Sequence, residues 1–441
     1  MFELTADWET LNEGSPEEIA CFAQVRITLN NVFLSEGHDP FVGRVRKASL
    51  LSAYHLAEWF AWNWWRLRWE PNGPGAGWRF AHAMPTIGEG YVWPNATIFP
   101  DGERVTIAAR PSNPADEFAV RYINEYVGAV PAAEFEGGVE RFILQVMGQL
   151  DAVGLRDTNL QRIWADLELE RRDGELSRYR RLEAMLGHDP EEGPQELIRQ
   201  LLADEARIGV EGARELAAEI AKGGRPLVAG ELIDLAHQIG TPTDLRDAVR
   251  LHDRVATARG DTPAWQVGQR AARAVRQQIG NHNEPLSNRQ LADLIAISPE
   301  VLASPAGRAP LSFSFRDDPA RANIVLRSRW ETGRRFDLAR LVGDVVASGQ
   351  SGPLIPATHS ATYRQKLQRA FAAELLSPFE AVDEMMRGDY SDERQEEVAE
   401  HFTVSPLTIR TMLVSHRKLD WDEVANDADL EAGIAYLPAA E

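Results

Sequence analysis

The chain has 441 residues, of which 44% are hydrophobic and 26% charged, and a formal net charge of −20. This length predicts two or three domains with hydrophobic cores of their own. No large segment is basic, so a broad nucleic-acid-binding surface is not expected. Cys21 is the single cysteine, which excludes disulfides within the chain and cysteine-based zinc sites. The N-terminus lacks a signal-peptide pattern and no apolar run could span a bilayer, so we expect a cytoplasmic protein without membrane association.

Tryptophan is concentrated in the first segment, which holds eight of the twelve tryptophans between positions 8 and 93. Residues 47–69 have apolar side chains at helical spacing and predict one helix, which the Pro and Gly residues after it end. Residues 91–93, 96–99 and 105–110 predict short strands. Together these elements indicate a small α+β domain over residues 1–128.

The tryptophans of this helix have two interpretations. They cover most of its circumference and therefore cannot all face one core: Trp59, Trp62, Trp64, Trp65 and Trp69. In the first interpretation the helix lies between a sheet and the helical segment that follows. In the second, these residues form an exposed surface for a protein or small-molecule partner, because aromatic side chains are concentrated at binding hot spots.

The middle and last parts of the chain differ in pattern. Residues 138–280 are almost wholly helical in their apolar spacing, which predicts a separate helical domain. Residues 284–441 mix short strands and helices and predict a third domain that ends in an acidic tail. Its expected elements are helices over 287–302, 334–346, 362–379 and 378–387, strands over 311–315 and 323–327, and a helical bundle from 390 onward. The whole chain is therefore expected to be α+β and mainly helical.

The helix predicted over 334–346 has the frame of a zinc-peptidase helix. Such helices carry H-E-x-x-H, in which two histidines four residues apart bind the metal and the glutamate activates its water. Residues 335–344, RFDLARLVGD, resemble the corresponding helix of the ImmA/IrrE metallopeptidase family, which reads roughly R-F-T-L-A-H-E-L-G-H. Residues 370–378, AFAAELLSP, resemble the F-A-A-E-L-L helix that follows in that family. The resemblance covers about residues 310–418 and implies a zincin-like α+β domain with a helical bundle.

The positions that carry chemistry in the family are all changed here. By the resemblance, the two histidines fall on Arg340 and Asp344, the glutamate on Leu341, and the third zinc ligand on Gln365. An arginine keeps a permanent positive charge where the metal should lie, and a leucine cannot exchange a proton. We therefore expect no catalytic residue, no metal and no other cofactor, and a degenerate pseudo-peptidase rather than an enzyme.

Arg340 and Asp344 have two interpretations as a pair. Four residues apart on one helix face, they can form an ion pair, which is worth about 0.3 kcal/mol if it is exposed. Alternatively, they brace the former cleft in place of the metal. The sequence leaves both interpretations open.

Residues 395–413 have the apolar spacing of a helix-turn-helix, with Ser405 as N-cap of the second helix. Several glutamates on the first helix oppose phosphate, and the family also has a structural helical element here, so we favour a packing role. In a DNA-binding role the contacts would come from residues predicted to be exposed and from the cations that follow: Thr408, Arg410, Thr411, Arg417 and Lys418. Residues 287–302 form a second, weaker candidate.

Members of the ImmA/IrrE family act in stress responses, phage defence and toxin–antitoxin modules. The resemblance therefore implies a bacterial regulatory or sensor protein that binds a protein partner through the retained cleft without cutting it. The partner would be a repressor, a toxin or antitoxin, or a defence component. Two alternatives stay open: a helix-turn-helix transcriptional regulator that binds DNA, and an enzyme with its site in the tryptophan-rich domain. The sequence identifies neither the partner nor the oligomeric state.

Overall fold

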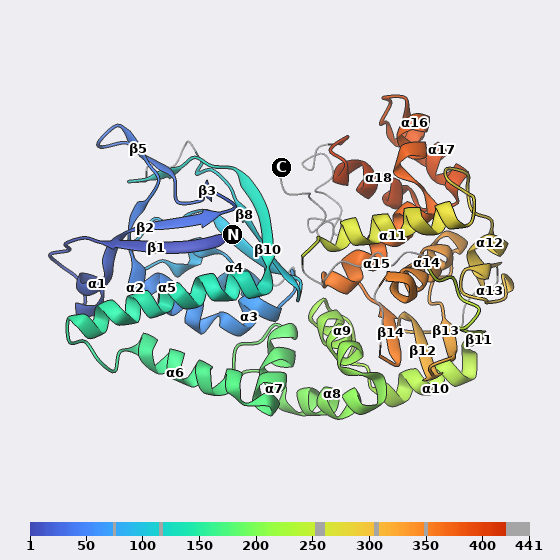
Figure 1. Ribbon diagram of the computed structural model, residues 1–441, viewed down its shortest axis with the longest axis horizontal. Helices are drawn as coiled ribbons and strands as arrows, with labels where there is room; N and C mark the ends of the chain where they lie inside the picture. Colours follow the sequence, from blue (N-terminus) through green and yellow to red (C-terminus); the bar gives the residue numbers. More distant parts are fainter. Residues whose placement is uncertain (74–75, 114–117, 252–260, 304–307, 348–351, 420–441) are drawn as a thin grey trace. The chain divides into compact units, whose positions relative to one another are not determined.

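The computed structural model describes residues 1–441 apart from 74–75, 114–117, 252–260, 304–307, 348–351 and 420–441 (Figure 1). The predicted acidic tail lies outside the described residues. The described chain is a mixed α+β protein, about half helical, with four small antiparallel sheets. It falls into two compact units, Met1–Pro194 and Gln195 onward. None of the helices in this described part has the length and apolar character that crossing a membrane requires.

Three of these sheets belong to the first unit. In the largest, β2 (Phe22–Leu29) pairs antiparallel with β1 (Phe2–Trp8), β3 (Val32–Phe33) and β6 (Ser49–Ser52). Every second residue of β2 is buried, which is the pattern of a strand with one face in a core. The other two sheets have the orders β10-β8-β7 and β5-β4-β9, with these bounds: β4 (Gly37–Asp39), β5 (Arg44–Arg46), β7 (Ala96–Pro100), β8 (Arg104–Ala109), β9 (Arg121–Tyr122) and β10 (Tyr126–Pro131).

The helices of the first unit enclose one hydrophobic core with these sheets. The long helix α5 (Ala132–Ala152) runs along β1 and contacts α2 (Ala53–Trp62), which in turn contacts α6 (Asn159–Arg172) (Figure 1). Their buried side chains form one continuous apolar cluster. The remaining helices are α1 (Pro16–Cys21), α3 (Trp64–Trp69), α4 (Ala76–His82), the 3-10 helix Met84–Ile87 and α7 (Gly174–Met185).

The prediction of one helix over 47–69 is wrong at its start and at its middle. Residues 49–52 pair with β2 as strand β6, and the hydroxyl of the last of them caps α2. Asn63 separates α2 from α3, because its side chain donates to Trp59 O and its backbone leaves helical geometry (φ −91°, ψ 11°). The strand predicted over 91–93 is also wrong, since the proline that follows has no N–H for a sheet.

The second unit is built on the fourth sheet, whose strand order is β11-β13-β12-β14. Helix α14 (Glu331–Ala347) contacts β12 and β14, and packs against α15 (Tyr363–Leu376). Helix α11 (Ala264–Gln278) lies across α14 and α15 (Figure 1). The strands are β11 (Thr241–Asp244), β12 (Ser312–Asp318), β13 (Arg321–Val325) and β14 (Leu354–Ala357). Three helices precede α11: α8 (Gln195–Ile208), α9 (Val210–Ala221) and α10 (Ala229–Ile239).

Glycines let the three central helices of this unit approach closely. A Cβ on Gly343 of α14 would lie 2.6 Å from the Phe371 ring of α15. A Cβ on Gly268 of α11 would lie 2.5 Å from Leu367 O, also on α15. Both distances are shorter than any normal carbon contact, so each crossing depends on the missing side chain.

The sequence predicted the helices and strands of this unit better than it predicted where the unit begins. The helix predicted over 334–346 lies inside α14, and the strands and helices predicted after residue 310 correspond to β12, β13, α15 and α16 (Phe379–Met386). Residues 138–280, predicted as a separate helical domain, are divided: α5 to α7 belong to the first unit and α8 to α11 to the second. The remaining helices are α12 (Asn288–Asp293), α13 (Glu300–Ala303), α17 (Asp392–Phe402) and α18 (Pro406–Ser415).

Candidate functional site

The four positions that the motif resemblance singles out lie in the second unit. Arg340, Leu341 and Asp344 are on α14 and Gln365 is in the first turn of α15, and each is at most 4% exposed. The small free energy given for an exposed pair of Arg340 and Asp344 therefore does not apply, because both residues are buried. Charged groups buried this deeply are stable only when other polar groups surround them.

Arg340 is bonded directly to the residue at the third-ligand position. Its Nη2 donates to Gln365 Oε1 and, at 2.5 Å, to Thr358 O. Gln365 Oε1 also accepts from Thr358 N at 2.9 Å, and Gln365 Nε2 donates to Pro356 O at 3.0 Å. The guanidinium thus joins α14 to α15 and to the segment between β14 and α15.

Asp344 is paired across the same two helices. Arg364 Nε donates to Asp344 Oδ1 at 3.0 Å and Arg364 Nη2 donates to Asp344 Oδ2 at 2.5 Å, a bidentate pair between buried side chains. Burial alone would lower the pKa of Arg364, but the carboxylates of Asp344 and Glu215 outweigh it and raise that pKa. Two polar braces, Arg340–Gln365 and Asp344–Arg364, therefore connect α14 with α15.

Helix α9 closes one side of this site. Thr362 Oγ1 donates to Glu215 Oε1 at 2.8 Å, and His359 N donates to Glu219 Oε2 at 2.7 Å. The same helix packs against β14, the last strand in the sheet order, whose four residues are all buried. The sheet edge next to α14 is therefore covered by the chain itself.

The two glutamates of α9 differ in their electrostatics. Burial raises the pKa of Glu215 above its usual value, and the opposing effect of Arg364 is smaller. Burial acts in the same direction on Glu219, but its bonds to His359 and the nearby charge of Arg340 outweigh it and lower the pKa of Glu219. One helix thus carries a carboxyl that favours its neutral form and, one turn later, a carboxyl that favours its charged form.

The donor atoms at the site do not suit zinc. Within the described ranges, no group of three or more His, Cys, Asp or Glu side chains is placed to hold a metal ion. A guanidinium, an alkyl group and an amide occupy three of the matched positions, and the fourth, Asp344, is bonded to Arg364. The arrangement can hold two helices together, and it offers water no general base at Leu341.

The candidate DNA contacts are partly engaged in the fold. Helices α17 and α18 form the predicted pair, and Ser405 caps α18 by accepting from Thr408 N. The prediction that Thr408 is exposed is wrong: it is 8% exposed, because its hydroxyl turns back to the Ser405 hydroxyl at 2.9 Å. Lys418 Nζ lies 3.0 Å from Asp383 Oδ1. The other candidates are half-buried or exposed: Arg410, Thr411 and Arg417. The second candidate pair, α12 and α13, packs against α14.

Most of the tryptophans considered as a partner surface are buried in the first unit. Trp59, Trp64 and Trp65 are at most 9% exposed, and Trp69 is half-buried against two arginine side chains. Trp62 is 55% exposed. This burial fits a helix held between a sheet and other helices, and it leaves Trp62 as the member of the set that a partner could reach.

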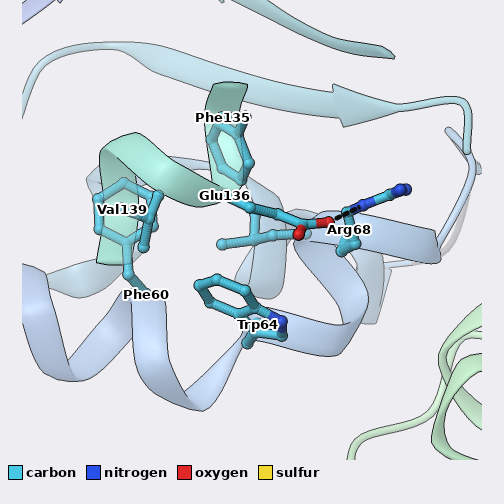
Figure 2. Close-up of a pocket in the computed structure, with 7 residues that line it drawn as sticks. Phe60, Trp64, Arg68, Phe135, Glu136 and Val139 are labelled. Atoms are coloured by element: carbon cyan, nitrogen blue, oxygen red, sulfur yellow. Dashed lines mark hydrogen bonds and ion pairs between the residues drawn. The ribbon is translucent and has the colours of Figure 1, made fainter. Parts of the chain in front are cut away.

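A small hollow lies beside α3 in the first unit (Figure 2). It is too small to hold a water molecule and is lined by Phe60, Trp64, Leu67, Arg68, Phe135, Glu136 and Val139. Arg68 Nε donates to Glu136 Oε1 at its edge. The one carboxylate among these lining residues, Glu136, is paired with Arg68.

Sequence reasoning missed two groups of buried ionic side chains. In the first unit, fully buried His82 has its Nε2 3.0 Å from Glu70 Oε2, which also accepts from Arg66 Nε at 2.6 Å. In the second unit, Glu215 is 147 positions away from the Thr362 hydroxyl that it accepts from. Neither group has a local pattern in the sequence, because its members come from separate elements.

Known proteins provide no further guide to this site. No family model, no curated protein and no solved structure matches the chain. The arrangement of its own residues, together with the motif resemblance, therefore carries the functional argument.

Proposed function

We propose that the chain is a catalytically inactive pseudo-peptidase of the ImmA/IrrE type that acts as a regulatory or sensor protein by binding a protein partner. The resemblance suggests a role in phage defence, a stress response or a toxin–antitoxin system. The partner would then be a repressor, a toxin or antitoxin, or another defence component, bound without being cleaved.

The observation that carries this proposal is the bond between Arg340 and Gln365. The resemblance assigns these positions to two ligands of one zinc ion, and two such ligands must lie within a few ångströms of each other. Positions 25 residues apart that the resemblance would join through a metal are here joined directly. The guanidinium supplies a fixed positive charge to an oxygen acceptor without any exchangeable ion.

The covering of the site decides where a partner would bind. The two braces fill the space between α14 and α15, and α9 covers the sheet edge beside them. A protein partner is therefore expected at the rim of the filled cleft rather than inside it. Exposed His359, which is bonded to Glu219 of α9, belongs to this rim.

Metal analysis and partner capture test the proposal. The purified full chain is expected to contain no stoichiometric zinc and to retain an intact protein partner from its native host. Stoichiometric zinc that is lost in Asp344→Ala would overturn the inactive assignment. A chain that captures no protein from its host under any growth or stress condition would overturn the regulatory assignment.

A DNA-binding regulator is the second candidate, favoured by the capped α17–α18 pair and the exposed Arg417. It requires salt-dependent binding of duplex DNA that Arg410→Ala and Arg417→Ala weaken. The burial of Thr408 and the ion pair of Lys418 argue against it. The third candidate is an enzyme of the tryptophan-rich domain, in which half-buried His55 has its Nε2 3.4 Å from Glu18 Oε1.

A further inference from the structure

The connection between β13 and α14 presents a tryptophan to solvent. We name residues 327–330 (Arg327, Ser328, Arg329 and Trp330) the Trp330 loop. Trp330 is 78% exposed, and both arginines of the loop are exposed as well. Tryptophan and arginine are the residues most enriched among those that dominate binding energy at protein interfaces.

Hydrogen bonds from a buried arginine fix the backbone of the Trp330 loop. Arg334, which is 3% exposed, donates to Ser328 O at 3.2 Å, Arg329 O at 2.7 Å and Leu302 O at 2.8 Å. Ser328 Oγ also donates to Trp330 O at 3.2 Å. A loop whose backbone is fixed in this way loses little conformational entropy when a partner binds.

The surroundings of this loop are positively charged. Residues 327–335 contain four arginines and one acidic residue, Glu331, in a chain whose net charge is −20. The hydrogen bonds of buried Arg334 and Arg335 go to neutral acceptors, namely backbone carbonyls and the Asn288 amide. Their charges therefore add to those of the exposed arginines, and the potential at the loop favours an anionic partner.

The Trp330 loop lies beside the segment between β14 and α15, which Arg340 contacts. Arg327 Nη2 is 3.4 Å from His359 Nε2, and His359 follows Thr358, whose carbonyl accepts from Arg340. The loop is therefore part of the rim where the proposed function expects a partner.

We propose that the Trp330 loop docks an acidic segment of a protein partner, with an apolar side chain of that segment packed on Trp330 and its carboxylates paired with Arg327 and Arg329. This inference rests on the proposed function, because it names the chemistry of the partner. The two exposed arginines of the loop are enough to pair with a few carboxylates of a peptide segment. A nucleic acid would extend its phosphates beyond them, over a surface that is acidic on balance.

The experiment measures binding of a fluorescent, glutamate-rich peptide with one central leucine to the full chain by anisotropy, at low and high salt. Trp330→Ala and Arg329→Glu are each expected to weaken binding at least about tenfold. Arg329→Glu should also reduce the salt dependence. Phe41→Ala, which removes an exposed aromatic side chain of the first unit, is the matched control and should leave binding unchanged. Because Trp330 and Arg329 are exposed, circular dichroism should show an unchanged fold in both variants.

Three outcomes overturn this inference: no binding of the peptide by the parent chain, equal binding by the parent and the Trp330→Ala chain, or tighter binding of a single-stranded oligothymidylate than of the peptide. Partner capture separates the two proposals. A host protein retained equally by the parent and by Trp330→Ala would leave the regulatory function standing and remove the loop from it. Peptide binding through Trp330 without any host partner would support docking by the loop and overturn the regulatory function.

Discussion

Two buried helix contacts, one in each unit, are filled by different kinds of side chain. Around α2, α3 and α5 the first core is aromatic, with Phe60 and Phe135 rings 6.3 Å apart and Trp64 and Trp164 rings 5.8 Å apart. Between α14 and α15 the second unit buries guanidinium, amide and carboxylate groups. Both helix pairs are buried, but only the first gains the full hydrophobic free energy of that burial.

This difference shows which of the two helix contacts is stabilised mainly by apolar packing. A buried ion pair often contributes no more to stability than apolar side chains of the same volume, so Asp344 and Arg364 are not the most stable way to fill their space. The aromatic core needs no explanation beyond its own stability. The polar layer instead depends on each buried charge having its partner on the neighbouring helix.

The largest expected effect is in the polar layer. Asp344→Ala leaves the Arg364 guanidinium buried without its bidentate partner and should lower the free energy of unfolding of the second unit by about 3–5 kcal/mol. Urea denaturation with a probe in that unit measures the loss. The double variant Asp344→Leu, Arg364→Met removes both charges and should recover most of it. A loss below about 1 kcal/mol in the single variant would show that the pair does not hold the helices together.

The aromatic core should respond less to a conservative change. Phe60→Leu keeps an apolar side chain of similar volume in the first core and should cost about 1 kcal/mol, with little dependence on pH. Thermal unfolding at several pH values measures this. A cost that varied strongly with pH would mean that the first core also depends on titrating groups, against the contrast drawn between the two units.

The two glutamates of α9 give a smaller effect whose sign depends on pH. Because the pKa of Glu215 is raised in the folded chain, its contribution to stability is fully present below the unfolded value of about 4.5 and is lost as pH rises through the folded pKa. Glu215→Gln should therefore gain melting temperature relative to the parent as pH rises. Glu219→Gln is the matched control on the same helix. The pKa of Glu219 is lowered, so this variant should lose melting temperature relative to the parent above pH 4.5. The same sign for both variants would contradict the assigned environments.

The smallest effect is expected on the surface of the first unit. Trp62→Ala removes a side chain that is 55% exposed and should change the free energy of unfolding by less than about 0.5 kcal/mol. Its neighbour Trp64, 5% exposed, gives the comparison: Trp64→Ala should cost several times more. Chemical denaturation of the two variants side by side checks the ranking. Equal costs would place Trp62 in the core.

Local patterns in the sequence predicted helices and their caps, but not the tertiary contacts that these helices make. The helix that became α14 and the Ser405 cap of α18 were predictable, because apolar spacing and capping act over a few residues. The break at Asn63 was missed, since its side chain competes with the helix only in a particular rotamer. The contact of Glu215 with Thr362 could not be predicted, because helical periodicity says which face is buried but not what covers it.

The sequence predicted which residues lie near one another at the candidate site, but not their burial or their hydrogen-bond partners. Matching the motif letters brought Arg340, Asp344 and Gln365 together, and the structure has them on adjacent helices. Their burial was not predicted, because arginine and aspartate are usually exposed unless paired, and Arg364 has no counterpart in the motif. The bonds of Gln365 to Arg340 and Thr358 likewise needed the three-dimensional arrangement.

Gly343 bears on how such chains can be recognised. Its contact with the Phe371 ring leaves no space for any other residue, whatever stands at the ligand positions. The packing of α14 on α15 therefore constrains position 343 independently of the residues at positions 340, 341 and 344. A search pattern anchored on Leu338, Ala339, Gly343 and Phe371 would follow this helix contact and would leave the residues at positions 340, 341, 344 and 365 free to vary.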